Sequence, residues 1–94
     1  MNIENTLSYD DVLLVPQYSD IKSRKEINIG NSFNNAEFNL PIISAPMDTV
    51  TEAAMAIAMQ EAGGLGIIHR YNSVAKQCRL VHNAISAGAK DVGA

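Results

Sequence analysis

The sequence has no tryptophan, a single cysteine and only 5% aromatic residues. One cysteine, Cys78, excludes an internal disulfide and a cysteine metal cluster, and it is typical of a reducing cytoplasm. The formal net charge of −3 leaves no basic surface for nucleic acid. The most apolar stretch, residues 53–68, is broken by Glu61 and by a Gly-Gly pair, so it is unsuited to span a bilayer. We therefore expect a cytoplasmic globular protein whose partners are neither nucleic acid nor a membrane.

What the chain does contain is enough apolar sequence for a packed interior. Hydrophobic residues make up 47% of its 94 residues and charged residues 18%, a balance that argues against disorder. The length nevertheless falls below the usual size of a domain, and a small core stabilises a chain only marginally. Composition thus predicts a folded unit that depends on further protein.

Residues 1–39 have the pattern of an arm followed by a small antiparallel pair of strands. A short apolar run, Val12–Val15, is stopped by Pro16, and we expect this segment to lie across a larger body. Apolar and polar residues alternate over 26–29 and again over 36–39. The alternation predicts two strands joined near Asn34-Asn35.

Residues 40–94 alternate between strand and helix patterns. Residues 41–45 form a continuous apolar run, which is typical of a parallel strand covered on both faces. Thr49 and Glu52 have the spacing of a capping box, which predicts the start of an alanine-rich helix that packs closely on a sheet. Glycine at 63 and 64 ends that helix, because glycine adopts a left-handed cap without strain.

The alternation continues to the last residue. Residues 65–69 read as a second buried strand, a helix capped by Asn72 or Ser73 follows and stops at Gly88, and residues 91–94 open a third strand. This order implies parallel crossovers. It amounts to roughly two and a half βα units of a (β/α)₈ TIM barrel. We therefore expect 40–94 to be the first strands and helices of an incomplete barrel, the chain being the amino-terminal piece of a longer or split protein.

Two blocks of sequence carry a family resemblance: LSYDDVLLVPQYSDI, and LPIISAPMDTVTEAAMAIAMQEAGGLGIIHR. Together they closely resemble the start of the inosine monophosphate (IMP) dehydrogenase and guanosine monophosphate (GMP) reductase family. The match runs from Leu7 to about Gln77, with both blocks in the expected order and spacing. The resemblance implies a cytoplasmic (β/α)₈ barrel enzyme, usually a homo-tetramer.

The resemblance also implies the chemistry. Dehydrogenases oxidise IMP to xanthosine monophosphate with NAD, through a cysteine thioimidate and with a bound monovalent cation such as potassium. Reductases convert GMP to IMP and ammonia with NADPH. The nucleophilic cysteine is expected beyond residue 94, and so are the cation ligands, so we expect no catalytic residue here and no activity from these residues alone. Cys78 lies in mid-helix on the apolar stripe, and we interpret it as a buried structural thiol.

The resemblance assigns substrate contacts to the loop after the first barrel strand. Met47 is expected to pack against the purine base, because a polarizable, unbranched side chain suits a flat heterocycle. Without the family match it would read as a core methionine. Ala45 stands where some dehydrogenases have a serine near the ribose, so that hydrogen bond is missing or replaced. Asp48 and Thr49 are expected to organise the turn.

Cofactor contacts are assigned to two basic segments. Ser23 and Arg24 match a reductase segment that reaches the dinucleotide of a neighbouring subunit. Arg70 stands where reductases carry a basic residue near the cofactor phosphate, and an arginine fork suits phosphate oxygens. Both arginines are equally compatible with exposed loop charges. His69, at a strand end, is expected to be a structural histidine that forms hydrogen bonds at the barrel rim.

The direction of the reaction rests on two opposed signals. Residues 44–52, SAPMDTVTE, follow the wording of dehydrogenases, whereas reductases typically have Ala-Asn in place of Ala-Pro. Residues 89–94 resemble the strand that resumes the barrel after the regulatory insert of most dehydrogenases, so the insert is expected to be absent, as in reductases and compact dehydrogenases. We favour an IMP dehydrogenase that uses NAD. The alternatives are a GMP reductase that uses NADPH and a non-catalytic barrel fragment that docks on a full-length relative.

Overall fold

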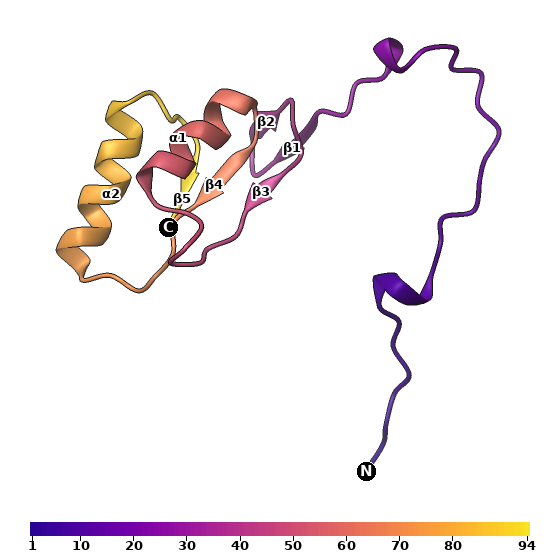
Figure 1. The fold of residues 1–94 in the computed structure, drawn as a ribbon, viewed down its shortest axis with the longest axis horizontal. Helices are drawn as coiled ribbons and strands as arrows, with labels where there is room; N and C mark the ends of the chain where they lie inside the picture. The colour runs from indigo at the N-terminus through magenta and orange to yellow at the C-terminus, as the bar shows by residue number, and fades with distance from the viewer.

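The computed structural model describes residues 1–94 and consists of a compact α/β body and a long extended arm (Figure 1). The body begins with a hairpin of β1 (Asn31–Phe33) and β2 (Ala36–Phe38). It continues through β3 (Ile43–Ser44), α1 (Ala53–Ala62), β4 (Leu65–Ile67), α2 (Val74–Ser86) and β5 (Val92–Gly93). Neither helix combines the length and the apolar character that a membrane span requires.

The three later strands form one parallel sheet in the order β3-β4-β5. Ile43 pairs with Leu65, and Gly66 pairs with Val92. This is the predicted strand–helix–strand–helix–strand unit with both crossovers parallel. The first strand is shorter and less covered than predicted: Ser44 is buried, but Ile43 is 54% exposed. The reason is that the two side chains point to opposite faces of the sheet, and Ser44 lies beside Gly66 on the face that α1 covers.

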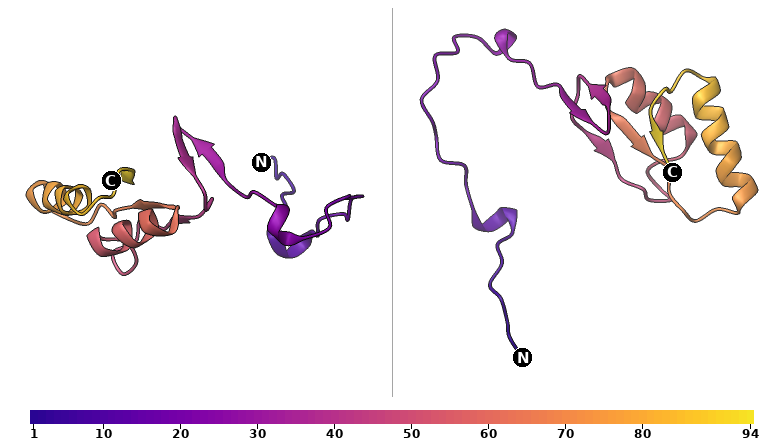
Figure 2. Two further views of the ribbon diagram at one scale, coloured as in Figure 1. Left: turned by 90° about the horizontal axis from the view of Figure 1, so that it is seen from above. Right: turned by 180° about the vertical axis from the view of Figure 1, so that it is seen from behind.

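The core lies between the sheet and the two helices, which pack on one side of it (Figure 2). Its fully buried members are Ala56 of α1, Ile68 after β4, Ala84 of α2 and Ala89 before β5. Alanine at 56 brings α1 close to β4, where an added Cβ at Gly66 would lie 2.6 Å from the Ala56 Cα. The predicted close packing of an alanine-rich helix on a sheet is thus confirmed.

Both helices end as their sequences predict, and α2 also begins at its predicted cap, whereas α1 does not. Gly63 closes α1 with a left-handed φ of 93°, and Ser73 caps α2 by accepting the N–H of Lys76. The prediction of a capping box formed by Thr49 and Glu52 is wrong. The helix begins at Ala53, with Glu52 as an N-cap that forms no side-chain cap bond. The Glu52 carboxylate instead accepts a hydrogen bond from a histidine outside the helix.

The hairpin joins through Asn34 and Asn35, as predicted, with positive φ values of 50° and 67°. Two such residues make the tight turn whose twist matches antiparallel strands. The first strand, however, is Asn31–Phe33 rather than residues 26–29, and Arg24–Glu26 form a short 3₁₀ helix, η2. A two-residue turn at 34–35 pairs Phe33 with Ala36, so residues 26–29 lie too far back to pair.

The arm, residues 1–30, extends away from the body (Figures 1 and 2). Its one local feature near the amino terminus is η1, the 3₁₀ turn Tyr9–Asp11, where Ser8 donates both its N–H and its hydroxyl to the Asp11 carboxylate. These bonds hold the pKa of Asp11 below its ordinary value. The apolar run is exposed, with Leu13 at 95% and Leu14 at 97%. Within these 94 residues the predicted packing of the arm across a body does not occur.

Cys78 is exposed, and its prediction as a buried thiol is wrong. The face of α2 that packs on the core carries Leu80, Val81 and Ala84. Cys78 belongs to a second apolar stripe next to this face, together with Val74 (82% exposed) and Ile85 (54% exposed). Two adjacent apolar stripes share Val81, and the sequence pattern alone does not show which of them meets the sheet.

Candidate functional site

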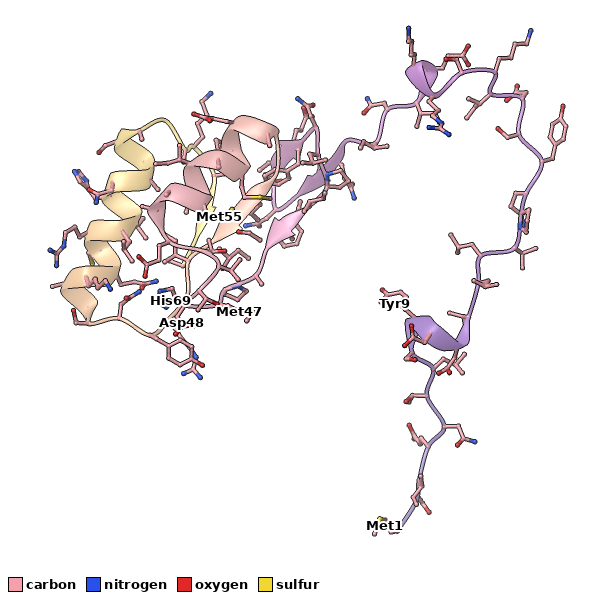
Figure 3. The ribbon with its side chains drawn as sticks, viewed as in Figure 1. Met1, Tyr9, Met47, Asp48, Met55 and His69 are labelled. Carbon is pink, nitrogen blue, oxygen red and sulfur yellow. The ribbon has the colours of Figure 1, made fainter.

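The residues of interest gather at the carboxyl ends of β3 and β4. The loop 45–52 leaves β3, and His69 and Arg70 follow β4. Figure 3 shows Met47, Asp48 and His69 grouped at this edge of the body. In parallel α/β sheets this is the edge where ligands bind.

The loop after β3 is closed by a turn whose acceptor is the Met47 carbonyl. The N–H groups of Val50 and Thr51 both donate to it, each at 3.0 Å. This turn leaves the Met47 side chain 52% exposed at the sheet edge. Asp48 and Thr49 occupy the turn itself and are exposed, which agrees with their predicted role in its organisation.

Thr51 ties the loop back to β3. It is fully buried, and its hydroxyl lies 2.7 Å from the Ala45 carbonyl and 2.8 Å from the Ser44 hydroxyl. A carbonyl oxygen only accepts, so Thr51 donates its single hydroxyl proton to Ala45 and the Ser44 hydroxyl donates to Thr51. Sequence reasoning missed both hydroxyl residues. The sequence feature that could have indicated them is a pair of hydroxyl residues at the two ends of a loop that needs internal hydrogen bonds.

A second connection joins the loop to the end of β4. The His69 side chain is 3% exposed, and its Nε2 lies 2.9 Å from the Glu52 Oε1. On the other side of the ring, the Tyr71 N–H donates to Nδ1 at 3.1 Å. The predicted structural histidine is therefore confirmed, whereas its carboxylate partner was not foreseen. The hydrogen bond from His69 lowers the pKa of Glu52; Lys76, 4.0 Å away, acts in the same direction, and desolvation opposes it more weakly.

The predicted cofactor residues lie in two separate places. Arg70 is exposed at the same edge as Met47, and its guanidinium carbon lies 5.0 Å from the centre of the Tyr71 ring. Ser23 and Arg24 lie on the arm at η2, remote from that edge (Figure 1). Ser23 caps η2 by accepting the N–H of Lys25. The structure thus places Ala45, Met47 and Arg70 at the carboxyl ends of the neighbouring strands β3 and β4, and Ser23 and Arg24 on the arm.

The chemistry of the edge suits an anionic ligand with a flat apolar part. Met47 offers an exposed thioether, and Arg70 offers five N–H donors and forms no ion pair with an acidic side chain. The chemistry of the Arg70 side chain therefore suits a phosphate group. The Ala45 carbonyl already accepts two hydrogen bonds, from Thr51 and from the Met47 N–H, and its side chain offers none. Ala45 therefore contributes shape rather than a polar contact.

The comparisons with known proteins, by family profile, by sequence and by structure, all indicate the same family. The profile of the IMP dehydrogenase / GMP reductase domain matches residues 6–90. The chain is 46% identical over 90 residues to an inosine-5'-monophosphate dehydrogenase of Nitrosopumilus maritimus, covering 95% of this chain and 19% of that protein. It is 45% identical over 76 residues to a GMP reductase of Leishmania donovani, covering 80% of this chain and 15% of that protein.

A solved structure agrees with the sequence relatives. The crystal structure of GMP reductase from Trypanosoma brucei in complex with guanosine 5'-triphosphate superposes with a TM-score of 0.79 at 45% identity. The match covers 84% of this chain and 19% of that one. The chain thus spans less than a fifth of the length of these relatives. On the profile, the identities and the superposition together, this chain belongs to the IMP dehydrogenase / GMP reductase family.

Proposed function

We propose that these residues form the amino-terminal part of a (β/α)₈ barrel oxidoreductase that acts on a purine nucleotide, and that its reaction is the oxidation of IMP with NAD. The observation that carries the proposal is the loop 45–52. It is anchored at both ends and presents Met47 at the carboxyl edge of the sheet, the same edge at which Arg70 follows β4. An apolar wall and a free guanidinium on one edge suit a purine ring and a phosphate.

In this proposal each residue has a limited task. Met47 packs on the purine base, and Ala45 leaves room beside the ribose. Arg70 pairs with a phosphate of the dinucleotide, and Ser23 with Arg24 reaches the dinucleotide of a neighbouring subunit in a homo-tetramer. NAD, when it is bound, accepts the hydride. The residues present here bind and orient the nucleotide and the dinucleotide. The cysteine nucleophile and the ligands of a monovalent cation such as potassium are assigned to other residues of the protein.

Two features favour a dehydrogenase that has no regulatory insert. The loop reads SAPMDTVTE, the wording of dehydrogenases. In addition, only residues 87–91 separate α2 from β5, and β5 pairs directly with β4, so no inserted domain stands between them. The single cysteine favours a reducing cytoplasm as the location.

The second candidate is a GMP reductase that uses NADPH. Its support is the 45% identity to the reductases of Leishmania donovani and Trypanosoma brucei, close to the 46% identity of the dehydrogenase from Nitrosopumilus maritimus. The short α2–β5 connection agrees with this candidate equally well. A non-catalytic fragment that docks on a full-length relative is the third candidate, supported by the exposed edge of β3.

One assay separates the three. The protein expressed from its complete reading frame is incubated with IMP and NAD in one tube and with GMP and NADPH in another. Formation of NADH in the first tube is the expected result. Loss of NADPH in the second tube alone makes the protein a reductase. If both tubes stay silent while the protein is folded, the enzyme proposal fails and the docking fragment remains.

A further inference from the structure

One chain of contacts links the loop of Met47 to Arg70, and the proposed function uses only its first bond, between Glu52 and His69. It starts at Glu52 in the loop after β3, passes through the buried ring of His69, and ends at Tyr71. The Tyr71 ring stacks on the His69 ring at a centroid distance of 6.1 Å and lies under the Arg70 guanidinium. The two exposed side chains at the edge are therefore connected through one imidazole.

The surroundings of His69 fix which ring nitrogen carries the proton. The Tyr71 N–H donates to Nδ1, so Nδ1 must be unprotonated. The opposite nitrogen faces a carboxylate, which only accepts, so Nε2 carries the proton and donates it to Glu52. Each side of the ring thus makes one distinct bond. The groups around this pair are the Lys76 ammonium, 4.0 Å from Glu52, and the adjacent Arg70 guanidinium.

The two bonds act on different segments. The bond to Glu52 holds the end of the loop whose turn closes on the Met47 carbonyl. The bond from Tyr71 holds the turn after β4, and the Asn72 amide adds to it by donating to the His69 carbonyl at 3.3 Å. Loss of one bond releases one segment and leaves the other held.

We propose that His69 is a positioning residue that holds the Met47 loop through its Nε2–H and the Arg70 turn through its Nδ1. The assignment of Met47 to the nucleotide and of Arg70 to the dinucleotide rests on the proposed function. The positioning itself is a property of the structure without ligands. His69 is 2% exposed, so in this proposal it acts through the two segments that it holds.

Two substitutions separate the bonds. The Asn amide oxygen lies at the position of Nδ1, so His69→Asn keeps the acceptor for Tyr71 and loses the donor to Glu52. The Gln amide nitrogen lies at the position of Nε2, so His69→Gln keeps the donor and loses the acceptor. The matched control is His82→Asn, at the other histidine of the chain, which is exposed on α2.

The first readout needs no activity. In the intact protein labelled with methyl-¹³C methionine and ¹⁵N tyrosine, His69→Asn is expected to shift the Met47 methyl signal and spare the Tyr71 amide. His69→Gln is expected to do the reverse, and His82→Asn to move neither. The wild-type imidazole ¹⁵N shifts are expected to show the neutral Nε2–H form at pH 8. An Nδ1–H form, or equal shifts of both probes in both variants, overturns the proposal.

The second readout is kinetic. Loss of one hydrogen bond corresponds to a change of about threefold to tenfold in an equilibrium constant. His69→Asn is expected to raise the KM for the nucleotide by about that factor and spare the dinucleotide KM, and His69→Gln to do the reverse. A merely structural histidine would lower the folded fraction in both variants without separating the two constants, and that result overturns the proposal. If the wild type turns over neither substrate pair, the proposed function fails, and the spectroscopic readout still decides the positioning.

Discussion

Replacement of Gly66 by alanine tests the contact that sets the position of α1 over the sheet. An added Cβ would lie 2.6 Å from the Cα of Ala56 and 3.0 Å from its Cβ. Carbon atoms pack best at about 3.5–4.0 Å, so the contact is too short by about 1 Å. The nearest atom is helix backbone, which has no side-chain rotamer to relieve the clash. The helix must therefore move away from β4.

The cost follows from that movement. Overpacking of a tight core typically costs about 1–3 kcal/mol, and we expect Gly66→Ala at the upper end because backbone must shift. Gly88 provides a contrast: an added Cβ there meets nothing within 4 Å, but its φ is +102°. Gly88→Ala therefore costs about 1 kcal/mol through backbone strain alone.

Urea denaturation of both variants, followed by circular dichroism, measures the two free energies of unfolding. The expected order places Gly66→Ala clearly below Gly88→Ala in stability. Gly66→Ala is also expected to weaken nucleotide binding, because α1 carries Glu52 at its start and its displacement separates Glu52 from His69. A Gly66→Ala protein within about 0.5 kcal/mol of the wild type would refute the close approach of helix and strand.

Three further predictions address the site. Thr51→Val removes the buried hydroxyl and is expected to destabilise the protein by about 1–3 kcal/mol and to raise the nucleotide KM. Thr51→Ser keeps the hydrogen bond to Ala45 and is expected to leave the KM unchanged. Equal KM values for the two variants would contradict this prediction. Because the bond from His69 lowers the pKa of Glu52, its stabilisation is complete above the ordinary value of 4.5 and is lost as the pH falls through the lower folded value. Between pH 7 and pH 3 the melting temperature should therefore fall more steeply for the wild type than for Glu52→Gln. Parallel curves of melting temperature against pH would contradict this prediction. Arg24→Ala is expected to raise the dinucleotide KM and spare nucleotide affinity, as measured by steady-state kinetics and calorimetry; an unchanged dinucleotide KM removes Arg24 from the site.

Sequence patterns predicted the parts of the fold that depend on local chemistry. Gly63, Ser73 and the Asn34-Asn35 turn act where they were expected, because caps and tight turns are decided by one or two residues. The parallel order of β3, β4 and β5 followed from the alternation of strand and helix patterns. Local sequence patterns were therefore sufficient to predict the order of strands and helices in residues 40–94.

The errors arose where a local signal competed with a contact distant in sequence. Thr49 and Glu52 have capping-box spacing, but Glu52 bonds to His69, 17 residues away, and the helix begins later. Cys78 lies on an apolar stripe, but the neighbouring stripe of α2 meets the sheet. Thr51 was missed for the same reason, since its partners become visible only when the loop is folded.

The central claim is that the loop after β3 presents Met47 to a purine nucleotide. The most direct test is a titration of the intact protein, labelled with methyl-¹³C methionine, with IMP and with GMP, the Met47 signal being assigned by Met47→Leu. The account predicts that the Met47 methyl signal moves and saturates with the nucleotide, while those of Met55 and Met59 on α1 stay in place. Saturable nucleotide binding by calorimetry with an unmoved Met47 signal would contradict it.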